Sequence, residues 1–313
     1  MSPTWTPNQT RVIRDLLGWD DELHPTMPPP SLTTGFLDDL VRRLEEEILS
    51  IAPDLGGDSI RVTKWDISAV IKCEGFFTSP DEFIWTARKL RGTVTHRAIQ
   101  ISLTGAGAML EPMQLVQRVI EGLADVEGDS VSEFLDTADE GTISDIVVAS
   151  ASDLTNFMAD WPPIRPGMTP RIESPISVPI VGGQVVLRGK YDLALGRPGK
   201  DPVVIVDLKT GLEQSEHRDE ARYYALLETL RIGVPPLRVA SYYLDSGTFQ
   251  VQDVNQDVLQ AAARRTSAAV GAIASLWRRT REPVLRSGPQ CRYCPLRNEC
   301  DVGIAWLAAQ AAG

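Results

Sequence analysis

The sequence predicts an α/β fold: a mixed β-sheet flanked by helices, with a helical N-terminal part and a C-terminal clasp of cysteines. Two patterns carry the prediction of the sheet and its helices. Residues 185–254 contain runs with the period of two, or the unbroken apolar character, that is typical of β-strands. Residues 37–51, 214–231 and 256–281 instead repeat apolar side chains at helical spacing. The third observation is that the chain has four cysteines, three of which lie close together near its C-terminus.

The strands of the predicted sheet follow one another along the chain. From Val185 to Leu195 the odd positions are mostly apolar and several even positions are charged, so we expect a half-buried strand with Asp192 on its polar face. Further strands are expected at three places, the last two as a hairpin around Asp245-Ser-Gly247: residues 202–209, 237–244 and 248–254.

The order of these patterns suggests four consecutive parts of the chain. The first ~35 residues should be irregular, because Pro25-Thr-Met-Pro-Pro-Pro30 blocks regular structure. The four parts are an N-terminal extension with one helix (1–60), a helical region carrying the first cysteine (61–160), the core sheet and helix (161–255), and a C-terminal helix with the cysteine cluster (256–313).

Composition limits the classes of protein that the chain can belong to. It has 313 residues and a net charge of −11, which argues against a globally basic coat for nucleic acid but leaves a local basic groove open. No apolar run is long enough to span a membrane, and the first residues do not have the pattern of a signal peptide. We therefore expect a cytoplasmic protein with no membrane partner, in which reduced cysteines bind a metal rather than form disulfides.

Asp192, Asp207 and Lys209 form the main candidate site. Side chains two residues apart on a strand share a face, so Asp207 and Lys209 should point the same way, and Asp192 lies on the neighbouring strand. Two such carboxylates suit Mg²⁺ or Mn²⁺, which would activate water against a phosphodiester, and a lysine would neutralise the developing negative charge. The alternative is a surface strand with ordinary charges. The apolar run before Asp207 and the Thr210-Gly211 turn after Lys209 favour a site.

These segments resemble the PD-(D/E)XK nuclease superfamily, and within it the RecB-like branch. The resemblance rests on Gly189-x-x-Asp192, Asp207-x-Lys209, Tyr224 on the following helix, and an upstream Gly92-x-x-x-His96. It implies a restriction-endonuclease-like fold. It also implies that His96, Asp192 and Asp207 bind the metal, and that Lys209 and Tyr224 belong to the catalytic site. The implied activity is a DNA exonuclease acting on single strands or free ends, with partners in a repair, recombination or defence complex.

One position departs from the pattern of these relatives. They usually carry glutamine four residues before the helix tyrosine, where this chain has Glu220. Glutamate keeps a hydrogen-bond acceptor but loses the amide donor and adds negative charge. We therefore expect Glu220 to be a weaker site residue than Tyr224.

The cysteines Cys73, Cys291, Cys294 and Cys300 suit zinc or a [4Fe–4S] cluster equally well by spacing alone. The arrangement of one upstream cysteine and three at the end resembles AddB and the small CRISPR-associated RecB-like nucleases. This resemblance implies that the four cysteines bind a [4Fe–4S] cluster with a structural role.

Two other classes of protein remain open at this stage. One is a catalytically quiet DNA-binding or adaptor subunit of a repair or defence complex, and the other is a zinc-stabilised interaction protein. Gly196-Arg-Pro-Gly-Lys200 is too short for a phosphate-binding loop, so no nucleoside triphosphate is expected. Neither His24 nor His217 is assigned a role.

Overall fold

The computed structural model describes residues 4–53, 55–57, 59–79, 84–104, 110–126 and 129–311. In this part of the chain a mixed sheet has the order β1-β3-β4-β5-β6, with β2 paired to the other edge of β3. The strands β1 and β5 run parallel to β3 and β4 respectively, and the other pairs are antiparallel. The bounds are β1 Ile60–Val62, β2 Arg171–Ile180, β3 Val185–Leu195, β4 Val204–Lys209, β5 Arg238–Tyr243 and β6 Thr248–Asp253.

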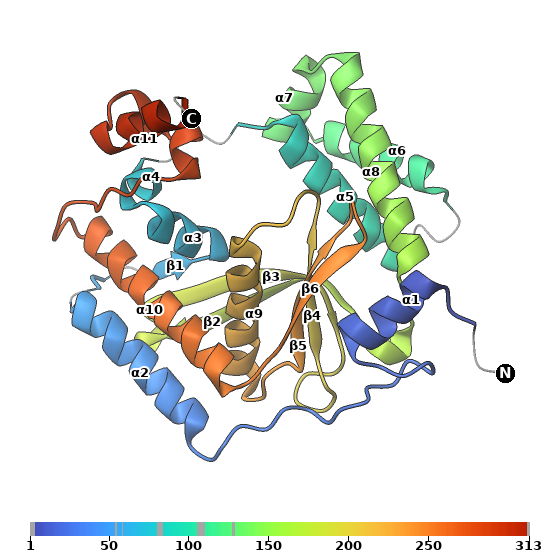
Figure 1. Cartoon of the computed structure of the whole chain (residues 1–313), viewed down its shortest axis with the longest axis horizontal. Helices are drawn as coiled ribbons and strands as arrows, with labels where there is room; N and C mark the ends of the chain where they lie inside the picture. Colours follow the sequence, from blue (N-terminus) through green and yellow to red (C-terminus); the bar gives the residue numbers. More distant parts are fainter. Residues whose placement is uncertain are drawn as a thin grey trace.

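Helices cover both faces of the sheet (Figure 1). One face packs against α2 Phe36–Ile51, α3 Lys64–Lys72, α9 Glu216–Ile232 and α10 Gln256–Trp277. The other shares a core with the π-helix η1 Val12–Leu17, α5 Ala87–Leu103, α6 Pro112–Ala124 and α8 Glu140–Asp160. The short helix α1 Pro7–Arg11 precedes η1 and has no buried residue. The shorter helices are α4 Glu74–Thr78, α7 Ser130–Thr137 and α11 Asp301–Ala311, with 3₁₀ turns η2 Pro166–Met168, η3 Val181–Gly183, η4 Pro289–Tyr293 and η5 Pro295–Asn298.

The architecture confirms the predicted α/β fold with a mixed sheet between helices. The helices predicted at 37–51 and 214–231 are α2 and α9, and the predicted hairpin is β5–β6. No helix in the described ranges is long and apolar enough to cross a membrane.

The N-terminal segment differs from its prediction. The prediction of an irregular first ~35 residues was wrong for residues 7–17, which form α1 and η1, so that more than the one expected helix lies within residues 1–60. The proline-rich stretch 25–30 contains no helix, as its prolines predict. Thr6 and Gln9 form a capping box that starts α1. Four apolar side chains of η1 are then completely buried against the sheet: Val12, Ile13, Leu16 and Leu17. Burial of this apolar face stabilises η1, which ends before the proline-rich stretch begins.

Strand β3 changes its pattern of burial at Asp192. Leu187 and Tyr191 lie in the core beneath α9, as the period of two predicts, but Leu193 lies in the core of the opposite face. The prediction of one polar face through Asp192 was therefore wrong, because both faces of β3 are buried from Tyr191 onward. Opposite Asp192 in the register, Glu173 of β2 has a φ of 48°, a left-handed conformation that breaks the regular pleat.

Candidate active site

A cavity of about 280 Å³ lies where β3 and β4 diverge, and four of the five predicted catalytic residues line it. They are His96 from α5, Asp192 from β3, and Asp207 and Lys209 from β4. The fifth, Tyr224, is not among its lining residues. Lys64 and His217, to which the sequence analysis gave no role, also line it. Whether these side chains act in catalysis stays a prediction.

The divergence of β3 and β4 opens this cavity. The ladder between them extends only from the pair Leu195–Val204 to the pair Leu193–Val206. The next backbone pair is replaced by a side-chain contact, in which the buried Leu208 N–H donates to Asp192 Oδ2 at 2.8 Å. Asp192 therefore satisfies a backbone donor that the split sheet leaves unpaired, and its other oxygen remains directed toward His96.

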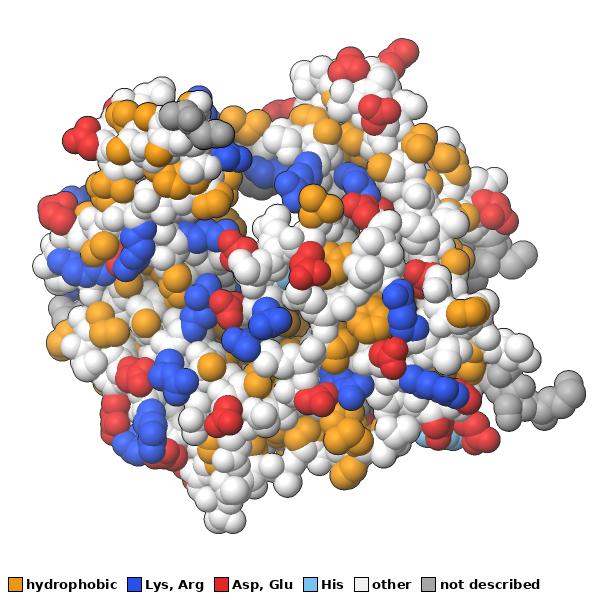
Figure 2. Space-filling view, in the orientation of Figure 1, with side chains coloured by type: hydrophobic (Ala, Val, Ile, Leu, Met, Phe, Trp, Pro, Cys, Tyr) orange, Lys and Arg blue, Asp and Glu red, His pale blue; other side chains and the backbone are white. Residues whose placement is uncertain are grey.

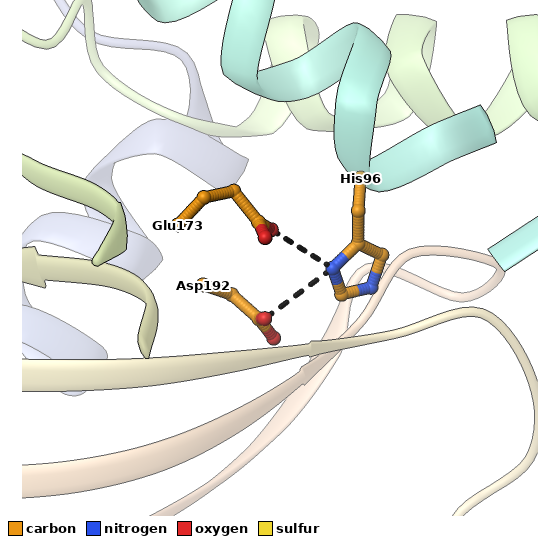
Figure 3. A group of neighbouring side chains, drawn as sticks. All are labelled: His96, Glu173 and Asp192. Carbon is orange, nitrogen blue, oxygen red and sulfur yellow. Dashed lines mark ion pairs between the residues drawn. The ribbon is translucent and has the colours of Figure 1, made fainter. Parts of the chain in front are cut away.

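His96, Glu173 and Asp192 form a group whose ligand atoms all lie within 4.8 Å of one another. His96 Nδ1 faces both carboxylates, at 3.4 Å from Glu173 and 3.3 Å from Asp192 (Figure 3). Burial alone would lower the pKa of His96, but the charge of Asp192 and then Glu173 outweighs it and raises this pKa to about 10. The sequence analysis missed Glu173, because its approach depends on the break in β2 rather than on any spacing in the sequence.

Asp207 and Glu220 share two lysines on the α9 side of the sheet. Lys209 Nζ lies 2.6 Å from Asp207 Oδ2 and 2.7 Å from Glu220 Oε2. Lys64 Nζ, from the start of α3, lies 3.1 Å from Asp207 Oδ1 and 3.5 Å from Glu220 Oε2. Burial disfavours the ionised carboxylate of Asp207, but Lys64 and Lys209 together lower its pKa far below the usual range. The two negative charges of Asp207 and Glu220 are thus balanced by the two positive charges of Lys64 and Lys209.

Tyr224 packs against Lys64 and the backbone of β3 beside this site. Its ring lies 5.1 Å from Lys64 Nζ, and its hydroxyl donates to the backbone oxygen of Lys190 at 2.8 Å. Gly189 makes this packing feasible, because a Cβ there would lie 2.9 Å from the Tyr224 ring. The glycine of the Gly-x-x-Asp pattern thus lets α9 approach β3 closely.

The upstream motif has a similar basis in packing. Gly92 and His96 are separated by one helical turn of α5, and a Cβ at Gly92 would lie 3.3 Å from Thr210 Oγ1. The small residue therefore brings α5, and with it His96, against the turn that follows Lys209. His217 reaches the same cavity from α9, with Nδ1 3.1 Å from the Tyr243 hydroxyl, and burial followed by the charge of Lys209 lowers its pKa.

The ligand atoms of His96, Glu173 and Asp192 fit a divalent cation, and two of these residues, His96 and Asp192, line the catalytic cavity. Carboxylate oxygens of Asp192 and Glu173 converge with an imidazole nitrogen, a set that proteins use for Mg²⁺ or Mn²⁺ and for related metals. Asp207 Oδ2 is buried and, despite its short approach to Lys209, accepts no hydrogen bond of normal geometry. Such an oxygen could take a further ligand at the wall of the cavity.

The four cysteines lie together although Cys73 is far from the others in the sequence. Cys73, Cys291, Cys294 and Cys300 all line one small pocket between α4, η4, η5 and the start of α11. All four are free thiols. Backbone N–H groups point at two sulfur atoms, Arg286 N at 3.4 Å from Cys73 Sγ and Gly303 N at 3.4 Å from Cys300 Sγ. Burial and then the neighbouring cysteines raise the pKa of Cys294.

Two solved structures share 11% sequence identity with the chain. One, named SSO0001, has a TM-score of 0.36, with 85% of this chain and 96% of that chain covered. The other, named "Putative exonuclease" and from Eubacterium rectale, has a TM-score of 0.46, with coverage of 88% and 93%. A search of curated proteins found no significant match.

The family comparison covers most of the chain. The model of the PD-(D/E)XK nuclease superfamily matches residues 80–301, more than two thirds of the 313 residues. The matched segment contains His96, Asp192, Asp207 and Lys209, which the fold brings to one cavity. The chain therefore belongs to the PD-(D/E)XK nuclease superfamily.

Proposed function

We propose that the protein is a metal-dependent DNA exonuclease of the RecB-like branch, acting on single strands or free ends and stabilised by a [4Fe–4S] cluster. The observation that carries the nuclease part is the convergence of His96, Asp192, Asp207 and Lys209 on one cavity. Membership of the superfamily supports hydrolysis of phosphodiester bonds. An adaptor or DNA-binding module would have no need of this charged and partly buried arrangement.

Each side chain has a distinct role in this proposal. His96, Asp192 and Glu173 would hold the ion, with Asp207 contributing its buried carboxylate. Mg²⁺ or Mn²⁺ bound there would polarise the phosphodiester and lower the pKa of the attacking water. Asp192 and Glu173 raise the pKa of His96 and so stabilise its protonated form. His96 must lose this proton before its nitrogen can bind the metal ion. Lys209 would stabilise the negative charge that develops on the phosphate.

A second and larger cavity supports the preference for single strands. It has a volume of about 1260 Å³ and shares His96 with the catalytic cavity. Trp65 and Tyr293 line it and remain 52% and 57% exposed, so both rings are open to a ligand in the cavity. Unpaired bases stack on aromatic rings of this kind, whereas the bases of a duplex are already stacked on one another.

Cations complete this larger cavity. Lys89 and Arg97 of α5 and Lys190 of β3 line it, in a chain whose net charge is −11. Figure 2 shows the surface hollowed between the α4–α11 region and α5, with Lys and Arg side chains along the α5 side. Cations beside exposed rings suit a single strand, whose phosphates and bases both need partners. A strand lying here would reach the group of His96 and Glu173, because both line the cavity.

The proposed [4Fe–4S] cluster is supported by the shared pocket of the four cysteines. Four cysteines in one pocket suit either one zinc ion or a [4Fe–4S] cluster, and the order of one upstream cysteine and three near the C-terminus supports the cluster. The cluster would tie α4 to the C-terminal segment, and Tyr293 between two of its ligands would be held at the larger cavity.

The test uses 5′- or 3′-labelled single- and double-stranded DNA incubated with Mg²⁺, Mn²⁺ or EDTA. We expect cleavage that needs the metal, is faster on single strands and releases short products from one end first. Closed circular single strands should resist cleavage if the activity is exonucleolytic. The absence of cleavage under all metal conditions, with the iron content intact, would reject the nuclease in favour of a DNA-binding subunit.

A further inference from the structure

Lys64 lines the catalytic cavity together with Lys209 and Arg88, and its position is fixed by the start of α3. It is the first residue of α3, after the N-cap Thr63. Thr63 and Asp66 form a capping box, with Thr63 N donating to Asp66 Oδ2 at 2.7 Å, so the first turn of α3 is firmly held. A lysine at a helix N-terminus is disfavoured by the helix dipole. Here nearby carboxylates on the sheet and on α9 offset that cost.

The contacts of Lys64 show which charges it balances. Its Nζ lies between Asp207 and Glu220, at 3.1 Å and 3.5 Å, and 5.1 Å from the centre of the Tyr224 ring. Only 2% of the Asp207 side chain and 20% of the Glu220 side chain are exposed. Burial opposes the charge of Lys64, but Asp207 and then Tyr224 and Glu220 outweigh it and raise its pKa. The ammonium group is therefore retained in a partly dry site.

Lys209 has the same two partners as Lys64. Without Lys64, the carboxylates of Asp207 and Glu220 would share a single ammonium group at 2.6 Å and 2.7 Å. A lysine held by one buried and one partly buried carboxylate is poorly available to a phosphate, because it would have to break both ion pairs.

We propose that Lys64 is a positioning residue for the reaction: it balances the charges of Asp207 and Glu220 when Lys209, which lies closer to both of them, turns to the scissile phosphate. The inference rests on the proposed nuclease function. It makes Lys64 and Glu220 an interdependent pair, in which the loss of the lysine is harmful mainly because the glutamate remains. Removal of both charges should then be much less harmful than removal of Lys64 alone.

The same two helices supply a matched control. Lys72 of α3 and Glu216 of α9 form an ion pair at 3.1 Å, with side chains 31% and 32% exposed, and neither residue lines the catalytic cavity. This second pair links the same elements with the same kinds of charge. A merely structural role of Lys64 in joining α3 to α9 would therefore be reproduced by Lys72.

The experiment compares Lys64→Met, Glu220→Gln, the double variant and Lys64→Arg with the control set Lys72→Met, Glu216→Gln and their double variant. We expect Lys64→Met to lower kcat by about 100-fold, the size of effect found when one electrostatic contributor is removed, with a smaller change in KM. Addition of Glu220→Gln should restore most of the rate, Lys64→Arg should retain it, and the control set should stay near wild type. A wild-type rate in Lys64→Met, or a double variant as slow as Lys64→Met, would overturn the proposal.

Urea unfolding of the same proteins separates this inference from the proposed function. Lys64→Met should lower the unfolding midpoint, and Glu220→Gln should raise it again in that background, because the unpaired carboxylate is removed. If wild type shows no metal-dependent cleavage, the nuclease proposal fails. The pairing of Lys64 with Glu220 is then tested by unfolding alone, and it is overturned if the midpoint shift of the double variant equals the sum of the shifts of the two single variants.

Discussion

Asp192 Oδ2 accepts a hydrogen bond from the backbone N–H of Leu208 at 2.8 Å, at the point where β3 and β4 separate. The same carboxylate faces His96 through its other oxygen. One side chain therefore satisfies a backbone donor where the two strands separate and also belongs to the candidate metal group. Different substitutions of Asp192 can therefore remove its negative charge alone or its charge together with the hydrogen bond to Leu208.

Asp192→Asn should remain folded but lose activity, because an amide oxygen can still accept the Leu208 N–H while the negative charge is lost. Asp192→Ala should in addition lower the free energy of unfolding by about 1–3 kcal/mol, the cost of a buried donor left without a partner. Urea unfolding and a cleavage assay measured on both variants check this. Equal stability of the two would show that the hydrogen bond to Leu208 contributes little.

Lys209→Ala and Asp207→Asn should each reduce cleavage by at least about 100-fold while the protein stays folded. The reason is their shared position on β4, where both line the cavity and lie 2.6 Å apart. Rates from freshly purified variants, with circular dichroism as a control for folding, check the prediction. Undiminished cleavage in either variant would remove it from the catalytic site.

Trp65→Ala and Tyr293→Ala should weaken the binding of single-stranded DNA, each by about 5- to 150-fold if one base stacks on each ring at 1–3 kcal/mol. Trp277→Ala is the control, because Trp277 is 53% exposed but lies at the end of α10 and not in the larger cavity. Fluorescence anisotropy with Ca²⁺ in place of a catalytic metal gives the dissociation constants. An equal loss in all three variants would argue against a specific strand path.

Cys73→Ala should damage the protein as much as Cys294→Ala, and the double variant should be no worse than either. The four cysteines line one pocket, so the loss of any ligand opens the same clasp. Anaerobically purified wild type should be brown with roughly four irons per chain, as expected for a [4Fe–4S] cluster. One zinc per chain in a colourless protein would replace the cluster by a zinc site.

Glu228 should make stability dependent on pH. It is fully buried and accepts hydrogen bonds from Arg171 at 2.7 Å, Arg231 at 2.7 Å and Tyr191 at 2.9 Å. Burial raises its pKa, but Arg171 and then Arg231 outweigh this, so its pKa is lowered. Its contribution to stability is then complete above the unfolded pKa of about 4.3 and is lost as the pH falls through the lower folded pKa.

Glu228→Gln tests this contribution, because it removes the charge and keeps the shape. The loss of unfolding free energy should be largest near pH 7 and should shrink as the pH falls below about 4. Melting curves of wild type and variant across this range check the sign. A difference between the two proteins that does not change with pH would show that the ionised form of Glu228 adds no stability.

The sequence by itself determined the features that depend on spacing within one element. Asp207 and Lys209 share a face because they are two residues apart on β4, and Gly92 and His96 lie one turn apart on α5. The α/β class and the β5–β6 hairpin followed from the same local periodicities. Such features need no knowledge of which elements pack together.

Only the tertiary structure decided what depends on pairing between distant segments. The separation of β3 from β4 brings Asp192 to Leu208, and the break opposite it brings Glu173 to His96. Lys64 joins Asp207 across 143 positions of the chain. These contacts depend on which strands pair and where a ladder stops, because the energy of a buried charge is set by its neighbours in space rather than in sequence.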